Sequence, residues 1–441
     1  MSPSRRVRKI LVTIGLLLLW VVVVICALLV KATWFAAPRV VRGDLSSIKT
    51  HLARSLDDAA AKKRLGSAAL VLVKGGEITS IDGFGIASVE IQSRVKSDQT
   101  LYRIASVSKA VTAWGVMKLV EEGKLSLDEP VMRHLKRWQF PGSEAYRDRV
   151  TVRQLLSHTS GLDDGLGYGG FGPGETVQTL EESLNLPKDS TVGPPRPVRV
   201  ATEPGTGMYY GSAGYTILQL LIEEVSKQKF ADYMKHAVLQ PLGMTKASFD
   251  LDAIVAEGRA PDLATSYDSE LNVHPQRRYT SQAGVALFVT PEDLGRFIVA
   301  YSAVKNPVLS QETIKEMLTP QPATGGTWGL GQTLYVANDA GGFVTGHDGG
   351  SPPGWGAMLR VNPATGNGMA IMVSGGSGAI NQLSHDWTYW ETGKITFDAR
   401  RQIVQSEIAS AALVMIVGAL AIVLVSWELS RVMSKVQRPL T

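Results

Sequence analysis

A serine and a lysine three residues apart, Ser106 and Lys109, are the first candidates for catalytic chemistry in this chain. From Ser106 onward, apolar residues recur at helical spacing up to Gly123, which predicts a buried helix that begins at Ser106. A serine there lies beside free backbone N–H groups, which would also stabilise an oxyanion formed when its hydroxyl attacks a carbonyl carbon. A lysine one turn later, among apolar side chains, is poorly solvated as a cation and can take the serine's proton near neutral pH.

The Ser-x-x-Lys spacing is a weak signal on its own. Two common residues at this spacing occur by chance in many proteins. Ser106 could equally be an ordinary helix N-cap, and Lys109 could extend its amine to the surface. Other stretches of the chain therefore decide between the two interpretations.

Two further stretches place reactive residue types next to predicted turns and strand ends. Residues 203–215 (EPGTGMYYGSAGY) put Tyr210 just before a predicted helix, and residues 346–355 (GHDGGSPPGW) end a predicted strand at His347 and continue through glycines. A tyrosine or an imidazole near the serine–lysine pair could pass a proton to a leaving group. A glycine-lined strand edge lets a substrate backbone approach and offers a second N–H to an oxyanion.

The pattern of apolar residues predicts strands near both ends of the region between residues 44 and 397, with helices between them. An amphipathic helix is expected at 45–64, followed by a glycine-turn hairpin of strands at 68–73 and 78–84. The other expected elements are helices at 215–227, 290–304 and 379–390, and strands at 330–336, 343–347, 357–361 and 369–373. This order predicts an α+β fold in which one antiparallel sheet, built from both ends of the domain, is flanked by helices and carries an inserted, mostly helical region.

Two apolar runs, residues 10–30 and 408–427, are each long enough to cross a bilayer as a helix, and both predict transmembrane helices. A cleaved secretory signal peptide is the alternative for the first run. The tails at residues 1–9 and 428–441 are basic, so the positive-inside rule places both in the cytoplasm. Residues 44–397 are then expected to form the extracytoplasmic domain of a two-pass protein in the cell membrane, with the lipid bilayer as a partner.

Charge and cysteine content exclude several function classes. The formal net charge is +5, but the excess lies in the two short tails, so nucleic-acid binding is not expected. Cys26, inside the first apolar run, is the only cysteine, which rules out a cysteine nucleophile, a disulfide or a thiolate metal site in the domain. The histidines are scattered and the sequence contains no H-E-x-x-H, so no catalytic metal or other cofactor is expected.

Four stretches in this order resemble the motifs of one known superfamily. They read LYRIASVSK, LLSHTSGL, PGTGMYYGSAGY and HDGGSPPG. The chain is similar, from about residue 66 to about residue 390, to the serine β-lactamases and penicillin-binding proteins. The nearest branch resembles the class C β-lactamases with their esterase and D-aminopeptidase relatives. The resemblance implies the β-lactamase/transpeptidase-like fold and no cofactor.

The resemblance also implies a role for particular residues. Ser106 would be the acylated nucleophile, Lys109 its base or electrostatic partner, and Tyr210 a proton relay. The backbone N–H groups of Ser106 and Gly350 would form the oxyanion hole. The residues expected to contact the substrate are Ser212, His347, Gly349 and Gly350. Whether the lysine or the tyrosine takes the first proton is left open.

Two departures from the family pattern bear on the substrate. Ser212 stands where the family usually has asparagine, and its hydroxyl is shorter and offers only one donor. His347 replaces a lysine that pairs with a substrate carboxylate in many penicillin-recognising members, and a neutral imidazole has no fixed charge for that purpose. Both changes favour an esterase or D-peptidase over an efficient β-lactamase.

The expected function is therefore a membrane-anchored serine hydrolase that forms an acyl-Ser106 intermediate. Its substrates would be esters, D-amino-acid amides, peptides of cell-wall type, or β-lactams. One alternative is a penicillin-sensing or ligand-binding membrane receptor with slow or no turnover. Another is an inactive binding module, which the intact Ser106, Lys109 and Tyr210 disfavour.

Overall fold

The computed structural model describes residues 3–34, 40–141, 146–163, 168–191, 194–268, 270–303 and 306–436, without the side chains of residues 3–10, 28–34, 377, 379, 402–411, 426 and 428–436. The chain divides into two compact units. One unit is Val40–Lys394, and the other combines Met1–Arg39 with Ile395–Thr441. The predicted domain limits at residues 44 and 397, and the predicted extracytoplasmic location, stay predictions.

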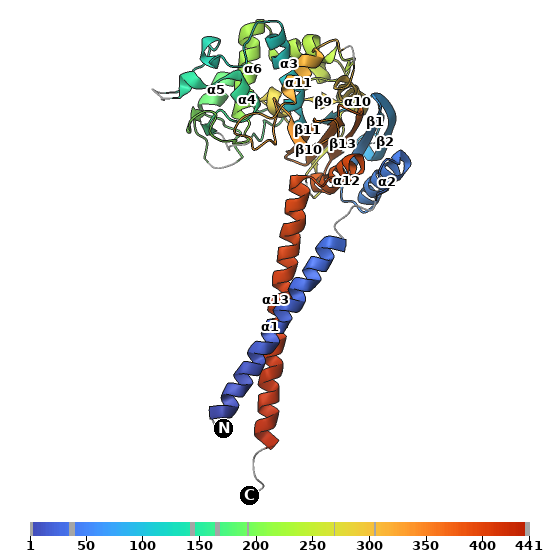
Figure 1. The fold of residues 1–441 in the computed structure, drawn as a ribbon. Coiled ribbons are helices and arrows are strands. Elements are labelled where there is room, and N and C mark those ends of the chain that lie inside the picture. Colours follow the sequence, from blue (N-terminus) through green and yellow to red (C-terminus); the bar gives the residue numbers. More distant parts are fainter. Residues whose placement is uncertain are drawn as a thin grey trace. The chain divides into compact units, whose positions relative to one another are not determined.

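A seven-stranded sheet forms the centre of the larger unit, in the order β10-β11-β12-β13-β1-β2-β3, with antiparallel neighbours throughout (Figure 1). Its strands are β1 (Ser67–Lys74), β2 (Glu77–Ser88), β3 (Ser93–Arg94), β10 (Thr333–Ala337), β11 (Phe343–Ser351), β12 (Trp355–Asn362) and β13 (Asn367–Ser374). The pairing of β1 with β13 joins the two ends of the domain. The predicted antiparallel sheet, built from both ends, is therefore confirmed.

The first hairpin forms because its turn residues are two glycines. Lys74 pairs with Glu77, so Gly75 and Gly76 are the two turn residues, with φ angles of +60° and +81°. A two-residue hairpin turn of this kind requires positive φ at both positions, which glycine adopts without a steric cost. The predicted hairpin of strands at 68–73 and 78–84 is thus found as β1 and β2.

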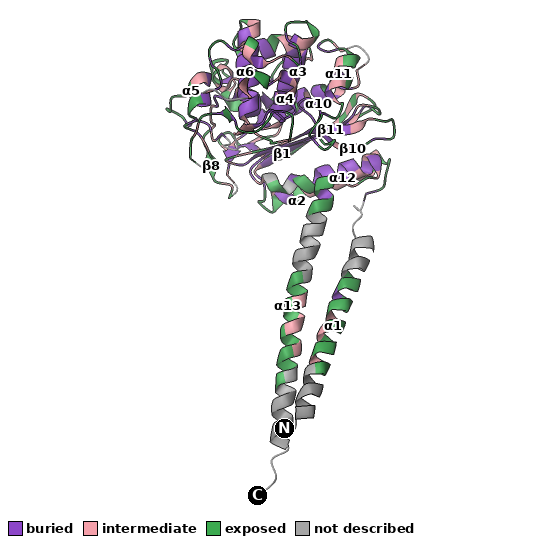
Figure 2. Cartoon of the chain, turned by 60° about the vertical axis from the view of Figure 1, so that its left-hand side comes forward, coloured by how far each residue is buried: buried purple, intermediate pink, exposed green. Residues whose placement is uncertain are grey.

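Both faces of the sheet are covered by helices. Ala68, Leu70 and Leu72 of β1 belong to one core with α2 (Leu45–Ala61) and α12 (Asn381–Thr392), whereas Ala69, Val71 and Val73 belong to the other core. Successive residues of a strand point to opposite faces, so an uninterrupted apolar strand such as β1 indicates burial on both sides. The second core contains α3 (Val107–Glu121) and α10 (Pro291–Ala300), and both layers are buried where they meet the sheet (Figure 2).

The regular structure between β4 (Tyr102–Arg103) and β10 is mainly helical, as predicted. Besides α3 and α10, its helices are α4 (Val152–Leu156), α5 (Leu180–Asn185), α6 (Ala213–Ser226), α7 (Phe230–Met234), α8 (Leu251–Ala256), α9 (Gln282–Val285) and α11 (Gln311–Met317). Short helical turns lie at Val131–Arg133, Arg147–Arg149, Lys235–Leu239 and Ala260–Asp262, and a further one at Ser377–Ile380 precedes α12. Three two-residue strand pairs brace it: β4 (Tyr102–Arg103) with β9 (Phe288–Val289), β5 (Leu162–Asp163) with β6 (Arg199–Val200), and β7 (Ser266–Tyr267) with β8 (Val273–His274).

The smaller unit consists of two long helices, α1 (Pro3–Trp34) and α13 (Phe397–Val436). Their described side chains are largely exposed (Figure 2). Among the residues that the structure describes, no helix combines the length and the apolar character needed to cross a membrane. The prediction of two transmembrane helices at 10–30 and 408–427 is therefore wrong.

Candidate active site

Ser106 and Lys109 lie together at the start of α3, as their spacing predicts. Ser106 is the N-cap residue, and Lys109 Nζ is hydrogen-bonded to Ser106 Oγ over 3.0 Å. Lys109 is completely buried, so its amine does not extend to the surface as the alternative interpretation required. A second hydrogen bond, from Lys109 Nζ to the carbonyl oxygen of Gly284, measures 2.9 Å. The lysine is thus fixed between the serine hydroxyl and one backbone carbonyl.

The sequence did not indicate Gly284, which lies on α9. A Cβ atom at this position would be 3.0 Å from Ser281 Oγ, a tight contact, and 3.7 Å from Lys109 Nζ, an ordinary one, so a larger residue would crowd the Ser281 hydroxyl. The role that Gly284 plays belongs to its backbone carbonyl, which every residue type carries. Glycine is favoured at position 284 only because the packing there is close, and the sequence contains no pattern that predicts this.

Tyr210 lies next to the serine–lysine pair and is about half exposed. The Lys109 Nζ atom is 5.3 Å from the centre of its ring. The ring also packs against three others, with centroids at 4.5 Å for His158, 5.8 Å for Trp328 and 6.1 Å for His347. Ring packing therefore orients the tyrosine while its face stays accessible.

His158 packs its ring against the ring of Tyr210. It adopts a left-handed backbone conformation, with φ of +58°, and its Nδ1 accepts a hydrogen bond from the Gly211 N–H over 3.4 Å. Burial, together with the nearby charge of Lys109, keeps the pKa of His158 well below its usual value, so the ring is neutral. Trp328, which packs on the same ring, was not singled out from the sequence.

His347 is buried at the middle of β11, and its environment keeps it uncharged. Burial and the charge of Lys109 lower the pKa of His347 to about 4. Nδ1 lies 2.7 Å from the carbonyl oxygen of Asp348, which can only accept, so Nδ1 carries the proton and Nε2 is left as an acceptor. Nε2 is buried and has no hydrogen-bond partner among the described residues. His347 therefore carries a lone pair at Nε2 and no positive charge.

The residue after His347 anchors the strand from its other face. Asp348 forms an ion pair with the fully buried Arg360 of β12, which also donates to Ser384 Oγ over 2.9 Å. Burial alone would raise the pKa of Asp348, but the charge and hydrogen bonds of Arg360 lower it, so the carboxylate stays ionised. The guanidinium lies 3.6 Å from the centre of the Tyr335 ring. This network fixes β11 beneath the site.

Gly349 brings β11 into direct contact with the nucleophile loop. A Cβ atom there would lie 2.5 Å from the carbonyl oxygen of Ile104 and 3.1 Å from the Ser106 nitrogen, so only glycine fits without displacement. At Gly350 a Cβ atom would meet nothing within 4 Å, which shows an open side. Among the described residues β10 pairs with β11 only from Phe343 to Gly346. The edge of β11 next to α3 is therefore open to a substrate backbone.

The two residues predicted to supply the oxyanion donors lie next to this contact, because Ser106 takes part in it and Gly350 follows Gly349. The Ser106 N–H makes no hydrogen bond within the described part of the chain, because the first bonds of α3 start from the next residues. Ser212 lies at the N-terminus of α6, and its carbonyl accepts a bond from the Thr216 hydroxyl over 3.3 Å. The structure thus brings Ser106, Lys109, Tyr210, His347 and Gly349 into one region. Their catalytic roles stay predictions.

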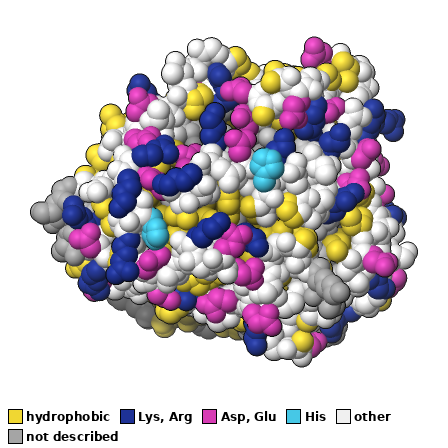
Figure 3. Space-filling view, turned by 90° about the horizontal axis from the view of Figure 1, so that it is seen from above, with side chains coloured by type: hydrophobic (Ala, Val, Ile, Leu, Met, Phe, Trp, Pro, Cys, Tyr) yellow, Lys and Arg dark blue, Asp and Glu magenta, His cyan; other side chains and the backbone are white. Residues whose placement is uncertain are grey.

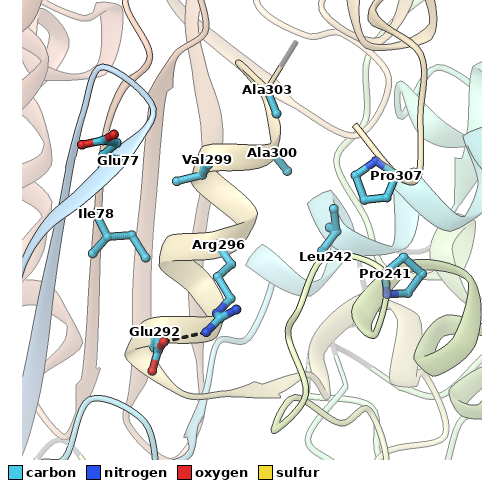
Figure 4. A pocket seen from close by; sticks show the side chains of 10 residues that line it. All are labelled: Glu77, Ile78, Pro241, Leu242, Glu292, Arg296, Val299, Ala300, Ala303 and Pro307. Carbon is cyan, nitrogen blue, oxygen red and sulfur yellow. Dashed lines mark hydrogen bonds and ion pairs between the residues drawn. The ribbon is translucent and has the colours of Figure 1, made fainter. Parts of the chain in front are cut away.

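The described part of the chain has no cluster of metal ligands, and the pocket on β2 and α10 lacks the residue types needed for catalysis by a serine. No group of three or more His, Cys, Asp or Glu residues that could hold a metal occurs in the described part of the chain. A pocket of about 490 Å³ is lined by β2, α10 and neighbouring loops (Figure 4), and its only described ion pair joins Arg296 to Glu292 over 2.7 Å. On the face seen from above, hydrophobic side chains form a band among charges of both signs (Figure 3). The Figure 4 pocket contains no serine, lysine or histidine.

Comparisons with known proteins agree with this geometry. Esterase EstB from Burkholderia gladioli is 27% identical over 330 residues, which is 67% of this chain and 82% of that protein. Protein flp from Staphylococcus aureus is 29% identical over 188 residues, but the match covers 43% of this chain and only 36% of that protein. The octameric penicillin-binding protein homologue from Pyrococcus abyssi superposes with a TM-score of 0.61 at 27% identity, covering 76% of this chain and 74% of that one.

The family assignment rests on a match that spans most of the larger unit. The model of the Beta-lactamase family matches residues 52–393, a range that runs from α2 to the residue after α12 and includes every predicted site residue. The fold agrees with that of the Pyrococcus abyssi structure. The chain therefore belongs to the beta-lactamase family, within the superfamily of serine β-lactamases and penicillin-binding proteins.

Proposed function

We propose that this protein is a serine hydrolase that works through an acyl-Ser106 intermediate. The observation that carries the proposal is the 3.0 Å hydrogen bond between Ser106 Oγ and the Nζ atom of a fully buried Lys109. A base within hydrogen-bond reach of a hydroxyl at a helix N-terminus is the arrangement that activates a serine nucleophile. An ordinary helix cap does not require the lysine to be buried beside it.

The proposed reaction has two halves. Ser106 Oγ attacks the substrate carbonyl carbon as its proton passes to Lys109 or to Tyr210, whose ring lies 5.3 Å from Lys109 Nζ. The negative charge that develops on the carbonyl oxygen is stabilised by the N–H groups of Ser106 and Gly350. The leaving group takes the proton and departs, which leaves an ester on Ser106. Water then attacks that ester, and Ser106 Oγ recovers its proton as the acid is released.

The site favours substrates that carry no carboxylate next to the reacting bond. His347 is neutral above a pH of about 4, so β11 offers no fixed cation for such a group. Ser212 offers one short hydroxyl where an amide would reach further. Esters and D-amino-acid amides or peptides are therefore proposed ahead of penicillins. The similarity to a protein named an esterase, at 27% identity over 82% of its length, supports this order.

The test is a comparison of three substrates on the full chain. Initial rates are measured with a p-nitrophenyl ester, a D-amino-acid p-nitroanilide and a penicillin, each with wild type and with Ser106→Ala. We expect turnover of the ester or the anilide that Ser106→Ala abolishes, and slower or no turnover of the penicillin. Equal rates for wild type and Ser106→Ala would contradict the proposal. A stable penicillin adduct without turnover of any substrate would instead indicate a penicillin-binding receptor.

A further inference from the structure

Arg103 is a buried arginine with no described carboxylate partner, three residues before the nucleophile. Its side chain is 1% exposed, and the described hydrogen bond that it makes runs from Nη2 to the carbonyl oxygen of Pro352 over 2.9 Å. Its Nε and Nη1 atoms are buried and have no hydrogen-bond partner among the described residues. Burying a guanidinium without a counter-charge costs free energy. Arg360, the other fully buried arginine near the site, has Asp348 as its counter-ion. Arg103 has no such described partner, so we expect a role of Arg103 other than stabilising the fold.

Aromatic rings and one carbonyl hold Arg103 in place. Its guanidinium lies 4.6 Å from the centre of the Tyr279 ring and 5.7 Å from that of Trp355, both within the range of cation–π attraction. Trp355 begins β12 and pairs with Ser351, the last residue of β11. Pro352 follows Ser351 directly. Arg103 therefore contacts the turn between β11 and β12 at both ends, through the Pro352 carbonyl oxygen and the Trp355 ring.

The contacts of Arg103 connect the two chain segments that carry the predicted oxyanion donors, Ser106 and Gly350. Arg103 ends β4, and the chain reaches Ser106 three residues later. The turn that it holds begins at Pro352, two residues after Gly350, which supplies the other N–H. Between the two donors the backbones already touch, because Gly349 leaves no room for a Cβ atom beside Ile104 and Ser106. A shift of the turn would therefore change the distance between the donors directly.

We infer that Arg103 is a positioning residue that sets the geometry of the oxyanion hole by tying the β11–β12 turn to the nucleophile loop. The inference rests on the proposed function. A misplacement of about 1 Å in such a site lowers the rate by roughly 100-fold, and loss of one donor lowers kcat by about 100- to 1,000-fold. The role is indirect, since Arg103 acts through Pro352 and Trp355.

The test separates oxyanion geometry from general damage by changing one atom of the substrate. The substrates are a p-nitrophenyl ester and the matching thionoester, in which sulfur replaces the carbonyl oxygen. Sulfur accepts hydrogen bonds weakly, so the thionoester gains little from the donors. The measured quantity is the ratio of kcat/KM for the two substrates, with folding checked by Tm and circular dichroism. The variants are Arg103→Met, Arg103→Lys and the control Arg259→Met.

Arg259 is the control because it also donates from Nη2 to a backbone carbonyl, that of Lys246, over 2.7 Å, whereas its guanidinium pairs with Glu257 and Asp262. We expect Arg103→Met to lower ester kcat/KM about 10- to 100-fold and thionoester kcat/KM by about threefold or less. The ester kcat/KM of Arg103→Lys should fall between those of wild type and Arg103→Met, because an ammonium cannot both donate to Pro352 and lie flat over Tyr279. Arg259→Met should leave the ratio unchanged.

Four results would overturn the inference. An equal loss on both substrates in folded Arg103→Met would assign Arg103 a structural role only. A rise in KM confined to an ester that carries a carboxylate, with an unchanged ratio for the neutral pair, would make Arg103 a counter-ion for the substrate. Absence of ester turnover by wild type would refute the proposed function, and this inference with it. Wild-type turnover with unchanged ratios would refute the inference alone.

Discussion

Replacing Gly349 with alanine should disable the site while leaving the fold largely intact. The added Cβ would lie 2.5 Å from the carbonyl oxygen of Ile104, and an ordinary contact begins near 3.4 Å, so β11 or the nucleophile loop must move by about 0.9 Å. The neighbouring atoms are backbone atoms, which cannot rotate away. A displacement of about 1 Å at reacting groups costs roughly 100-fold in rate, and overpacking costs about 1–3 kcal/mol of stability.

The matched control is the neighbouring glycine. A Cβ at Gly350 meets nothing within 4 Å, and its N–H is kept, so Gly350→Ala should lose much less activity. The assay is kcat/KM for a small p-nitrophenyl ester, with Tm measured on each variant. Gly349→Ala with wild-type kcat/KM would refute the reasoning. So would Gly350→Ala with the greater loss of the two.

Two further predictions concern charges in the site. Lys109→Met should lower ester kcat/KM by about 100- to 10,000-fold, because the amine that accepts the Ser106 proton is lost. Tm should not fall, because the buried amine is replaced by an apolar chain of similar length. Unchanged activity would remove Lys109 from the mechanism. The pKa of His347 is about 4 in the folded protein against 6.5 unfolded, so the unfolded chain binds the proton first as pH falls. The stability that His347 contributes is therefore present above pH 6.5 and is lost between pH 6.5 and 4, by up to about 3 kcal/mol. In urea unfolding, the free energy of unfolding should fall less between pH 6.5 and 4 in His347→Gln than in wild type. Equal losses in the two proteins would contradict the burial of a neutral His347.

The periodic parts of the fold could be predicted from the sequence because local chemistry determines them. The Gly75–Gly76 turn requires positive φ at both positions, and the apolar spacing after Ser106 allows only a buried helix. The predicted strand at 343–347 was too short, because β11 continues to Ser351. Gly349 and Gly350 have low strand propensity, but their pairing with Ala357 and Gly356 overrides it.

The contacts that complete the site leave little trace in the sequence. The Gly284 carbonyl that binds Lys109 is a backbone atom, and the packing of Trp328 on Tyr210 joins residues over 100 positions apart. Arg103 lies inside the LYRIASVSK motif, yet its partners Pro352 and Tyr279 are visible only in three dimensions. Hydropathy alone also led to the two predicted transmembrane helices, which the described helices do not support.

The most direct test of the account is to locate the acyl group after a rapid quench. The full chain is mixed with a p-nitrophenyl ester, quenched in acid within the first turnover, digested and mapped by peptide mass spectrometry. The account predicts one added acyl group on the peptide that contains Ser106, which decays as product forms and is absent in Ser106→Ala. An acyl group on another residue, or turnover by Ser106→Ala at the wild-type rate, would contradict it.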